Sequence, residues 1–183
     1  MRVAISGTHG IGKSTLIDAF VRRHDNYVVE PEAYEALEDL YGEVFAAEPS
    51  AEDFFRQLEY HVGRLRAYGA GDQVVFERSP ADYVAYLQAL EDLSRGTADA
   101  RLTERAIETA REAMAMLDLI VYLPCKGGGP EMEDPELGGA VDVCLEGILV
   151  NDDLSLFGGS RPLVIEAAGT TAQRLRLLEV ALR

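Results

Sequence analysis

The sequence predicts an α/β domain in which a five-stranded parallel sheet is covered by helices on both faces. Short runs rich in Val and Ile recur at residues 2–6, 27–30, 74–77, 119–123 and 163–166. These runs are continuously apolar rather than alternating, which is typical of buried parallel strands. Segments with helical periodicity separate them, and this regular alternation of strand and helix is the second observation that predicts the fold class.

Helix start signals mark several of the segments between the strands. Ser79 and Pro80, followed by Asp82, supply an N-cap, a proline at the first helical position and a capping carboxylate. Thr170 and Gln173 form a second capping pair, which opens the last helix. Apolar residues then recur at helical spacing in two segments: Tyr83, Tyr86, Leu87, Leu90 and Leu93 in the first, and Leu102, Ala106, Ala110, Met114 and Leu117 in the second.

Length and composition favour one domain that spans residues 1–183. A chain of 183 residues with 48% hydrophobic residues can bury a sizeable core. No stretch approaches the roughly 18 apolar residues of a membrane span, and the amino-terminal run reaches glycine too soon for a signal peptide. The two cysteines, Cys125 and Cys144, lack metal-binding spacing. We therefore expect a cytoplasmic protein that does not bind membranes.

The charge of the chain argues against a nucleic acid polymer as partner. Seventeen basic and 32 acidic residues give a net charge of −15, and no basic tract interrupts this pattern. Such a surface repels polynucleotides, whereas a small anion can still bind to a local cluster of amides and cations. Only Lys13 and Lys126 are lysines, and Lys13 lies in a glycine-rich stretch.

That glycine-rich stretch, GTHGIGKST, follows the first predicted strand and precedes an amphipathic segment. It matches G-x-x-x-x-G-K-[ST] without a gap. Glycines let backbone N–H groups approach phosphate oxygens, and the next helix adds its positive end. The lysine supplies a mobile charge, and the serine hydroxyl is a Mg²⁺ ligand. The sequence therefore predicts a P-loop NTPase fold that binds ATP and Mg²⁺ through Gly7, Thr8, His9, Gly10, Ile11, Gly12, Lys13, Ser14 and Thr15.

Two further motifs stand at the carboxyl ends of predicted strands, where open parallel sheets bind ligands. Glu30 and Pro31 end the second run, and Glu77, Arg78 and Ser79 follow the third. A guanine-reading N-K-x-D motif is missing, since the nearest candidate, residues 151–153, lacks the lysine. In order and spacing, GTHGIGKST, E-P and E-R-S resemble the deoxyribonucleoside kinase and thymidylate kinase branch of the P-loop kinases.

This resemblance implies a catalytic set and a metal site. In that branch the E-P carboxylate, here Glu30, is the general base that takes the proton of the acceptor hydroxyl. The E-R-S carboxylate, here Glu77, lies near the magnesium with Ser14, and Arg78 lies beside the reacting groups. Lys13, Glu30 and Arg78 are thus the expected catalytic residues. The alternative interpretation is that Glu30 merely ends a strand and that Glu77 pairs with Arg78.

Less specific features suggest where the acceptor and the adenine bind. The segment 53–68 resembles the helix over the nucleoside pocket of the same branch, although its apolar residues also form an ordinary core stripe. After the fifth strand, a Gly-Thr pair stands where P-loop kinases hold adenine, and a turn with a capping threonine explains the same residues. The candidates are Tyr34, Gln57, Tyr60, Arg64 and Arg78 for the acceptor, and Gly169 and Thr170 for the adenine.

The segment 124–139, PCKGGGPEMEDPELGG, is predicted to be a mobile lid loop. Kinases of this branch usually carry arginines in such a lid. Here Lys126 is followed by no lysine or arginine until Arg161, and eight acidic residues lie between them. The transferred phosphoryl group would then be stabilised by Lys13, magnesium and Arg78, with Lys126 or Arg161 as further candidates. Otherwise, the acceptor is not a nucleoside.

The function expected from these features is an ATP- and magnesium-dependent kinase whose small-molecule acceptor is nucleoside- or nucleotide-like. The alternative is a nucleotide-binding switch or slow ATPase without an acceptor, and a third interpretation is a loop that binds another phosphate, such as a cofactor's. Small proteins with a similar R-S-P-x-D-x-x-A-Y-L stretch, here residues 78–87, are often classed as AAA-type ATP-binding proteins or predicted kinases. The sequence leaves open whether the chain forms a homodimer.

Overall fold

The computed structural model describes residues 1–42, 50–95, 100–125, 134–158 and 161–183. Its five strands form one parallel sheet, as the sequence predicts, and the structure gives their order as β2-β3-β1-β4-β5. The strand order changes direction at β1, so the crevice beside the end of β1 is where this topology is expected to bind ligands. The strands are β1 (Arg2–Ser6), β2 (Val28–Glu30), β3 (Val74–Glu77), β4 (Leu119–Tyr122) and β5 (Leu163–Glu166).

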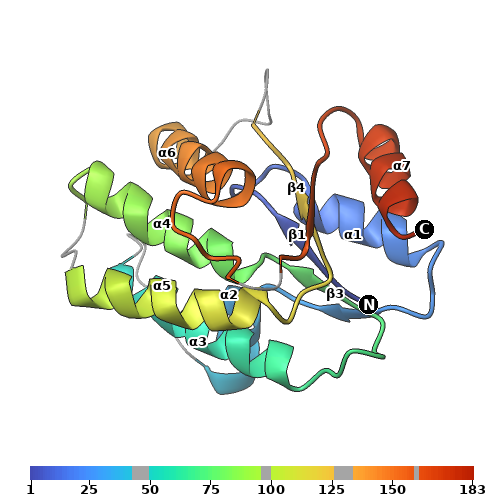
Figure 1. Ribbon diagram of the computed structural model, residues 1–183, viewed down its shortest axis with the longest axis horizontal. Helices are drawn as coiled ribbons and strands as arrows, with labels where there is room; N and C mark the ends of the chain where they lie inside the picture. Colours follow the sequence, from blue (N-terminus) through green and yellow to red (C-terminus); the bar gives the residue numbers. More distant parts are fainter. Residues whose placement is uncertain (43–49, 96–99, 126–133, 159–160) are drawn as a thin grey trace.

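Helices cover both faces of the sheet (Figure 1). The helices α1 and α7 pack on one face, and α3, α4, α5 and α6 pack on the other. Successive side chains of β1 serve the two cores alternately, since Val3 and Ile5 belong to the first and Ala4 to the second. The helices are α1 (Lys13–Val21), α2 (Ala33–Tyr41), α3 (Ala51–Arg66), α4 (Pro80–Asp92), α5 (Ala100–Met114), α6 (Pro135–Glu146) and α7 (Thr171–Ala181), with a π-helical turn η1 (Gly147–Asn151) after α6.

The predicted helix starts are confirmed by the capping geometry. Ser79 and Asp82 form a reciprocal capping box at the start of α4, and Pro80 occupies the first turn. Thr170 and Gln173 form the same arrangement at the start of α7. Both helices therefore begin where the local sequence predicts.

The prediction that all five strands are buried is wrong for the two edge strands. Val28 and Val29 of β2 are 52% and 42% exposed, and Leu163 of β5 is 51% exposed. Each of these strands has a neighbour on one side only, and the helices cover them incompletely. An apolar run in the sequence predicts a strand, but it does not distinguish the middle of a sheet from its edge.

The prediction of one loop over residues 124–139 is wrong at its carboxyl end. Residues 126–133 lie outside the described part of the chain, but α6 already begins at Pro135. The Asp134 side chain accepts a hydrogen bond from the Leu137 N–H at 3.1 Å and so caps the helix. Arg95 binds the carboxylates of both Asp134 and Glu136. A cap, a proline in the first turn and this cross-helix contact favour helix here.

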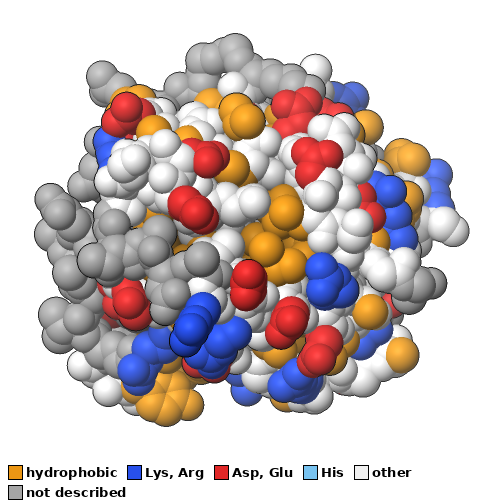
Figure 2. Space-filling model, turned by 60° about the vertical axis from the view of Figure 1, so that its left-hand side comes forward, with side chains coloured by type: hydrophobic (Ala, Val, Ile, Leu, Met, Phe, Trp, Pro, Cys, Tyr) orange, Lys and Arg blue, Asp and Glu red, His pale blue; other side chains and the backbone are white. Residues whose placement is uncertain are grey.

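Acidic side chains and small groups of arginines are interspersed on the face that Figure 2 shows, which is the side of α4 to α6 in Figure 1. Among the described residues, no helix is long and apolar enough to cross a membrane.

Candidate active site

The glycine loop connects the end of β1 to the start of α1 by a backbone that only glycine fits at two positions. Gly7 has φ +150°, and a Cβ there would lie 2.9 Å from both the Leu123 carbonyl oxygen and Ile11 Cγ2. Gly12 has φ +94° and is the N-cap of α1, which has no side-chain cap among the described residues. The first backbone N–H groups of α1 are therefore available to an anion, together with the positive end of the helix.

Lys13, Ser14 and Glu77 come together at the mouth of this loop, as the sequence predicts. Lys13 is only 3% exposed, and its Nζ donates to the Thr8 carbonyl at 3.0 Å and lies 3.8 Å from Glu77 Oε1. Burial, together with the nearby charge of Arg78, lowers the pKa of Lys13 to about 8. A second anion, such as a phosphate, would stabilise this buried cation.

Ser14 and Glu77, the two residues predicted to hold the metal, contact each other. Ser14 Oγ donates to Glu77 Oε1 at 3.2 Å, so a hydroxyl and a carboxylate oxygen face each other. Burial raises the pKa of Glu77 although Lys13 opposes the shift. Hydroxyl and carboxylate oxygens are the donors that Mg²⁺ prefers, and this ion commonly completes its shell with phosphates and water. The two residues therefore fit a Mg²⁺ ion that is bound together with a nucleotide.

Arg78 lies behind the glycine loop in a backbone conformation that is unusual for its residue type. It follows β3 directly, has φ +73° and is 3% exposed. Its guanidinium binds the Glu32 carboxylate, donates to the Gly7 carbonyl at 3.3 Å and lies 4.9 Å from the centre of the Tyr86 ring. Burial alone would lower the pKa of Arg78, but the charge of Glu32 holds it well above its usual range.

Two residues of α4 hold the glycine loop from the same side. Asp82 Oδ1 accepts the Gly7 N–H at 2.9 Å while its Oδ2 accepts the Ser79 N–H at 2.8 Å. Tyr86 Oη accepts the His9 N–H at 3.1 Å. The sequence explained Asp82 as a cap and Tyr86 as core, and both explanations hold. Their contacts with the loop arise from tertiary packing and left no local signal.

Glu30 and Glu32 have different partners. Glu30 ends β2, and its carboxylate accepts from Arg64 Nε at 3.0 Å and from Nη2 at 2.6 Å, with a further hydrogen bond from the Tyr68 hydroxyl. Glu32 is instead the N-cap residue of α2 and binds Arg78. Sequence reasoning selected Glu30 and missed Glu32, although both carboxylates stand at the same strand end.

The predicted acceptor residues of α3 lie on one face of that helix, at spacings of three and four. Gln57 is buried, Tyr60 is half-buried with its ring 6.2 Å from that of Tyr41, and Arg64 binds Glu30. His61 lies among them, where burial lowers its pKa to about 3. Its Nε2 has no hydrogen-bond partner among the described residues.

The remaining candidates lie elsewhere around the site. Tyr34 stands in the first turn of α2, where a hydrogen bond with Glu38 raises its pKa. Gly169 and Thr170 are exposed in the turn before α7. Arg161 donates to the Leu149 carbonyl at 3.2 Å and lies over the Phe157 ring, so it is bound to η1 and to the segment that follows it. Lys126 is outside the described residues.

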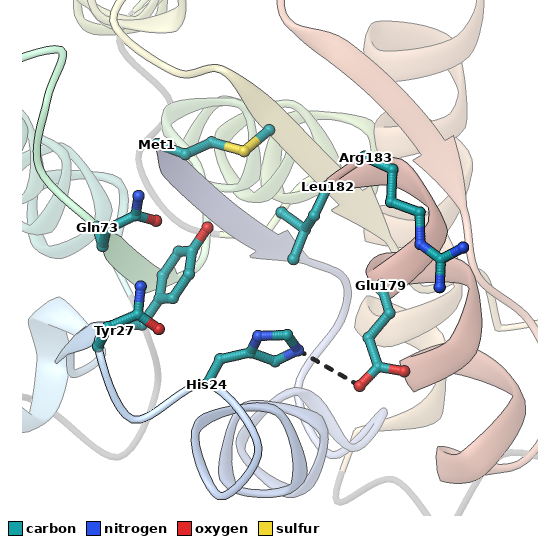
Figure 3. Close-up of a pocket in the computed structure, with 8 residues that line it drawn as sticks. Met1, His24, Tyr27, Gln73, Glu179, Leu182 and Arg183 are labelled. Atoms are coloured by element: carbon teal, nitrogen blue, oxygen red, sulfur yellow. Dashed lines mark hydrogen bonds and ion pairs between the residues drawn. The ribbon is translucent and has the colours of Figure 1, made fainter.

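A separate hollow of about 590 Å³ opens near the chain ends, between Met1, His24, Tyr27, Gln73 and Glu179 (Figure 3). Met1 and Gln73 directly precede β1 and β3, so the hollow lies at the amino ends of these strands. His24 Nε2 and Glu179 Oε1 are 3.4 Å apart at its edge. It is therefore at the opposite end of the sheet from the glycine loop and is not part of the candidate active site.

Comparison with known proteins agrees with this architecture. A family model described as AAA domain matches residues 2–136. No curated protein sequence matches the chain.

Among solved structures, a NadR protein in complex with NR has 18% identity and a TM-score of 0.67 over 99% of this chain and 49% of its own. Deoxyadenosine kinase from M. mycoides with bound dATP has 17% identity and a TM-score of 0.65, covering 100% of this chain and 99% of its own. Thymidylate kinase from Candida albicans has 16% identity and a TM-score of 0.61, covering 98% and 89%. The chain spans about half the length of the NadR chains.

At these identities the structural likeness shows the fold, whereas the family match covers more than half of the sequence and includes the glycine loop. The chain therefore belongs to the AAA domain family and has the P-loop fold that these kinases share.

Proposed function

We propose that the chain is an ATP- and Mg²⁺-dependent kinase that transfers the γ-phosphoryl group of ATP to a small, nucleoside- or nucleotide-like acceptor. The observation that carries this proposal is the convergence of Lys13, the Ser14 and Glu77 pair, and Arg78 with Glu32 on one glycine loop. A loop that only binds phosphate does not need a buried arginine and carboxylate pair beside it, whereas phosphoryl transfer needs both charges.

In this proposal each side chain has one task. Backbone N–H groups of the loop and Lys13 bind the phosphates, and Ser14 and Glu77 hold Mg²⁺, which would neutralise charge on the phosphate oxygens. The acceptor oxygen forms a bond to the γ-phosphorus as the bond to the β-γ bridging oxygen breaks and ADP leaves. The acceptor proton passes to a carboxylate, and Arg78 stabilises the charge of the transferred group.

Two carboxylates are candidates for that proton. The resemblance assigns it to Glu30, but the contacts favour Glu32. Glu32 binds Arg78 and lies in the field of Lys13, so it is on the phosphate side of the site. Glu30 accepts three hydrogen bonds from Arg64 and Tyr68, and these occupy its oxygens. We therefore assign the base to Glu32 and keep Glu30 as the alternative.

The acceptor class is supported by likeness alone. Structures similar to this chain include a deoxyadenosine kinase and a thymidylate kinase, as well as a NadR protein in complex with NR. The proposed acceptor residues lie on two helices, Tyr34 on α2 and Gln57, Tyr60 and Arg64 on α3. Tyr34 lies in the field of Glu32, and Arg64 binds Glu30, whose charge also acts on Tyr60. The net charge of −15 makes a polynucleotide acceptor unfavourable.

The test is thermal stability with ATP or ADP, with and without Mg²⁺, followed by a panel of nucleosides, nucleoside monophosphates and unrelated hydroxyl compounds. Ligand at a hundredfold excess over its dissociation constant stabilises the native state by about 2.7 kcal/mol. We expect a Mg²⁺-dependent rise with ATP, a further rise with one acceptor class, and ADP formation that requires this acceptor. A Lys13→Met variant is the control and should show none of these.

A nucleotide switch or slow ATPase is the second candidate function. It is favoured by the lack of lysine and arginine between residues 127 and 160. Two results together would support the switch and contradict the kinase proposal. The rate of ATP hydrolysis would be the same with and without every acceptor, and the affinity for a partner would differ between the ATP-bound and ADP-bound states. No stabilisation by any nucleotide would contradict both.

A further inference from the structure

Arg174, in the first turn of α7, reaches across to the glycine loop. Its Nη1 donates to the Ile11 carbonyl at 2.7 Å. A Cβ placed on Gly12 would lie 3.3 Å from the same nitrogen. The guanidinium therefore lies against the part of the loop that leads into Lys13, although 163 residues separate it from Ile11 in the sequence.

The position of Arg174 relative to the loop is fixed by the packing of α7 on α1. Leu175 and Leu178 are buried in the same core cluster as Leu16 and Phe20 of α1. Near the other end of α7, Glu179 forms an ion pair with Arg23, and its Oε1 lies 3.4 Å from His24 Nε2. These contacts hold α7 against α1 and the residues that follow it, so they fix the position of Arg174 beside the glycine loop.

No carboxylate in the described part of the chain balances the charge of Arg174. Arg64, Arg78 and Arg95 each bind at least one acidic side chain, but Arg174 forms no ion pair among the described residues. Its Nε is buried and has no acceptor there. Burial therefore lowers the pKa of Arg174 without an opposing charge. The chain has 32 acidic and 17 basic residues. A cation beside a phosphate loop that has no carboxylate partner in the described part of such a chain is an arrangement that an anion would complete.

We infer that Arg174 binds the phosphates of the donor nucleotide and supplies, from α7, a cation that the sequence between residues 127 and 160 lacks. The planar guanidinium presents several N–H groups in a geometry that matches phosphate oxygens, and the hydrogen bond to Ile11 orients it without neutralising it. This inference rests on the proposed ATP site and adds a residue to it that neither the P-loop motif nor the kinase resemblance includes.

The experiment measures the dissociation constant of MgATP and of adenosine by calorimetry for the wild type and three variants of the full chain. Arg174→Met removes the charge and the donors, whereas Arg174→Gln removes the charge but keeps an N–H donor for the Ile11 carbonyl. Arg176→Met is the matched control, because Arg176 lies on the same helix and donates only to the Ala172 carbonyl among the described residues. The midpoint of thermal unfolding without nucleotide monitors folding.

We expect both Arg174 variants to weaken MgATP at least about tenfold, as the loss of a charged hydrogen bond to phosphate does. Adenosine affinity and the unfolding midpoint should change little, and Arg176→Met should bind MgATP like the wild type. If Arg174→Gln binds MgATP normally, Arg174 only braces the loop and the inference is wrong. It is also wrong if Arg174→Met has no effect or if Arg176→Met has an equal one. A wild type that fails to bind MgATP would instead contradict the proposed function itself.

Discussion

Glu30 and Glu32 are separated by a single proline, yet they belong to different parts of the molecule. Glu30 faces the carboxyl end of α3, where Arg64 of the helix and Tyr68 just beyond it bind the carboxylate. Glu32 faces the glycine loop, where it binds Arg78. Arg64 is 41% exposed in its side chain and Arg78 only 4%. The first pair is thus partly hydrated, whereas the second is held in a low-dielectric site where charges act strongly on a neighbouring phosphate.

Proximity in sequence therefore does not give these two acidic residues the same role. The Glu30 cluster, which consists of Glu30, Arg64 and Tyr68, joins an edge strand to a helix, so we expect it to contribute mainly to stability. The Glu32 cluster, which consists of Glu32 and Arg78, is joined to the glycine loop by the contact of Arg78 with the Gly7 carbonyl. We therefore expect it to contribute mainly to phosphoryl transfer. The four predictions below test this division.

The largest expected effect is on the turnover of a Glu32→Gln variant. Its kcat should fall at least about a hundredfold, because general base catalysis typically contributes about 10²–10⁴-fold. Glu30→Gln should lower kcat by less than about tenfold, because the base is assigned to Glu32. Both are measured as acceptor-dependent ADP formation, well below the unfolding midpoint of each variant. Glu32→Asp is the control, since it keeps the carboxylate. The opposite ranking of the two glutamine variants would return the base to Glu30.

The second prediction concerns the pH dependence of nucleotide binding at the loop. Burial lowers the pKa of Lys13 to about 8, so the free protein loses this charge above that pH. A phosphate binds the charged form, and MgATP affinity should therefore fall up to about tenfold for each pH unit above pH 8. Calorimetry across this range measures it. Lys13→Arg stays charged and should remove the dependence, whereas a flat wild-type profile would contradict the role of Lys13.

The third prediction concerns the stability that Glu30 provides. Glu30→Gln should lower the free energy of unfolding by about 1–2 kcal/mol at neutral pH, a value that allows for the exposure of Arg64. Burial alone would raise the pKa of Glu30, but the hydrogen bonds from Arg64 and Tyr68 lower it overall. A lowered pKa gives stability above the unfolded value of about 4.3, which is lost as the pH falls through the folded value.

Urea unfolding at neutral and at acidic pH checks this. The difference between wild type and Glu30→Gln should narrow in acid. A difference that is constant with pH would show that the Glu30 charge does not contribute to it.

The smallest effect is expected for Tyr68→Phe, which removes one hydroxyl from the Glu30 cluster. The loss of one hydrogen bond should cost about 0.5–1.5 kcal/mol of unfolding free energy and leave kcat unchanged. The same unfolding and turnover measurements apply, with Tyr27→Phe as the control, because Tyr27 lies away from both clusters at the amino end of β2. A fall in kcat without a change in stability would mean that the Glu30 cluster takes part in transfer.

The sequence predicted those parts of the site that depend on local geometry. A single strand, loop and helix unit contains Gly7, Gly12, Lys13 and Ser14. The backbone geometry of the loop and the expected contacts with phosphate and metal restrict the residue type at each of these positions directly. The segment at Pro135 was predictable too, since Asp134 and Pro135 repeat the cap and proline signal that correctly placed α4. The glycines and acids around that signal favoured a loop instead.

The parts that were missed depend on which distant elements meet. Nothing around Glu32 indicates that the arginine after β3, rather than one on α3, will reach it. Tyr86 has an ordinary core position on α4, and only the fold shows that its hydroxyl faces the His9 N–H. Arg174 lies in the last helix, and its contact with Ile11 requires the packing of α7 on α1. In each of these cases one local pattern is compatible with several tertiary partners.

The left-handed backbone of Arg78 also bears on how this protein tolerates change. A non-glycine residue at φ +73° costs on the order of 1 kcal/mol, and glycine would relieve that cost. That gain is smaller than the loss, because removing the guanidinium would leave the Glu32 carboxylate without its buried partner, which typically costs about 3–5 kcal/mol. Thermal stability and chemistry therefore make the same demand at this position, so laboratory evolution for heat resistance alone would retain the guanidinium.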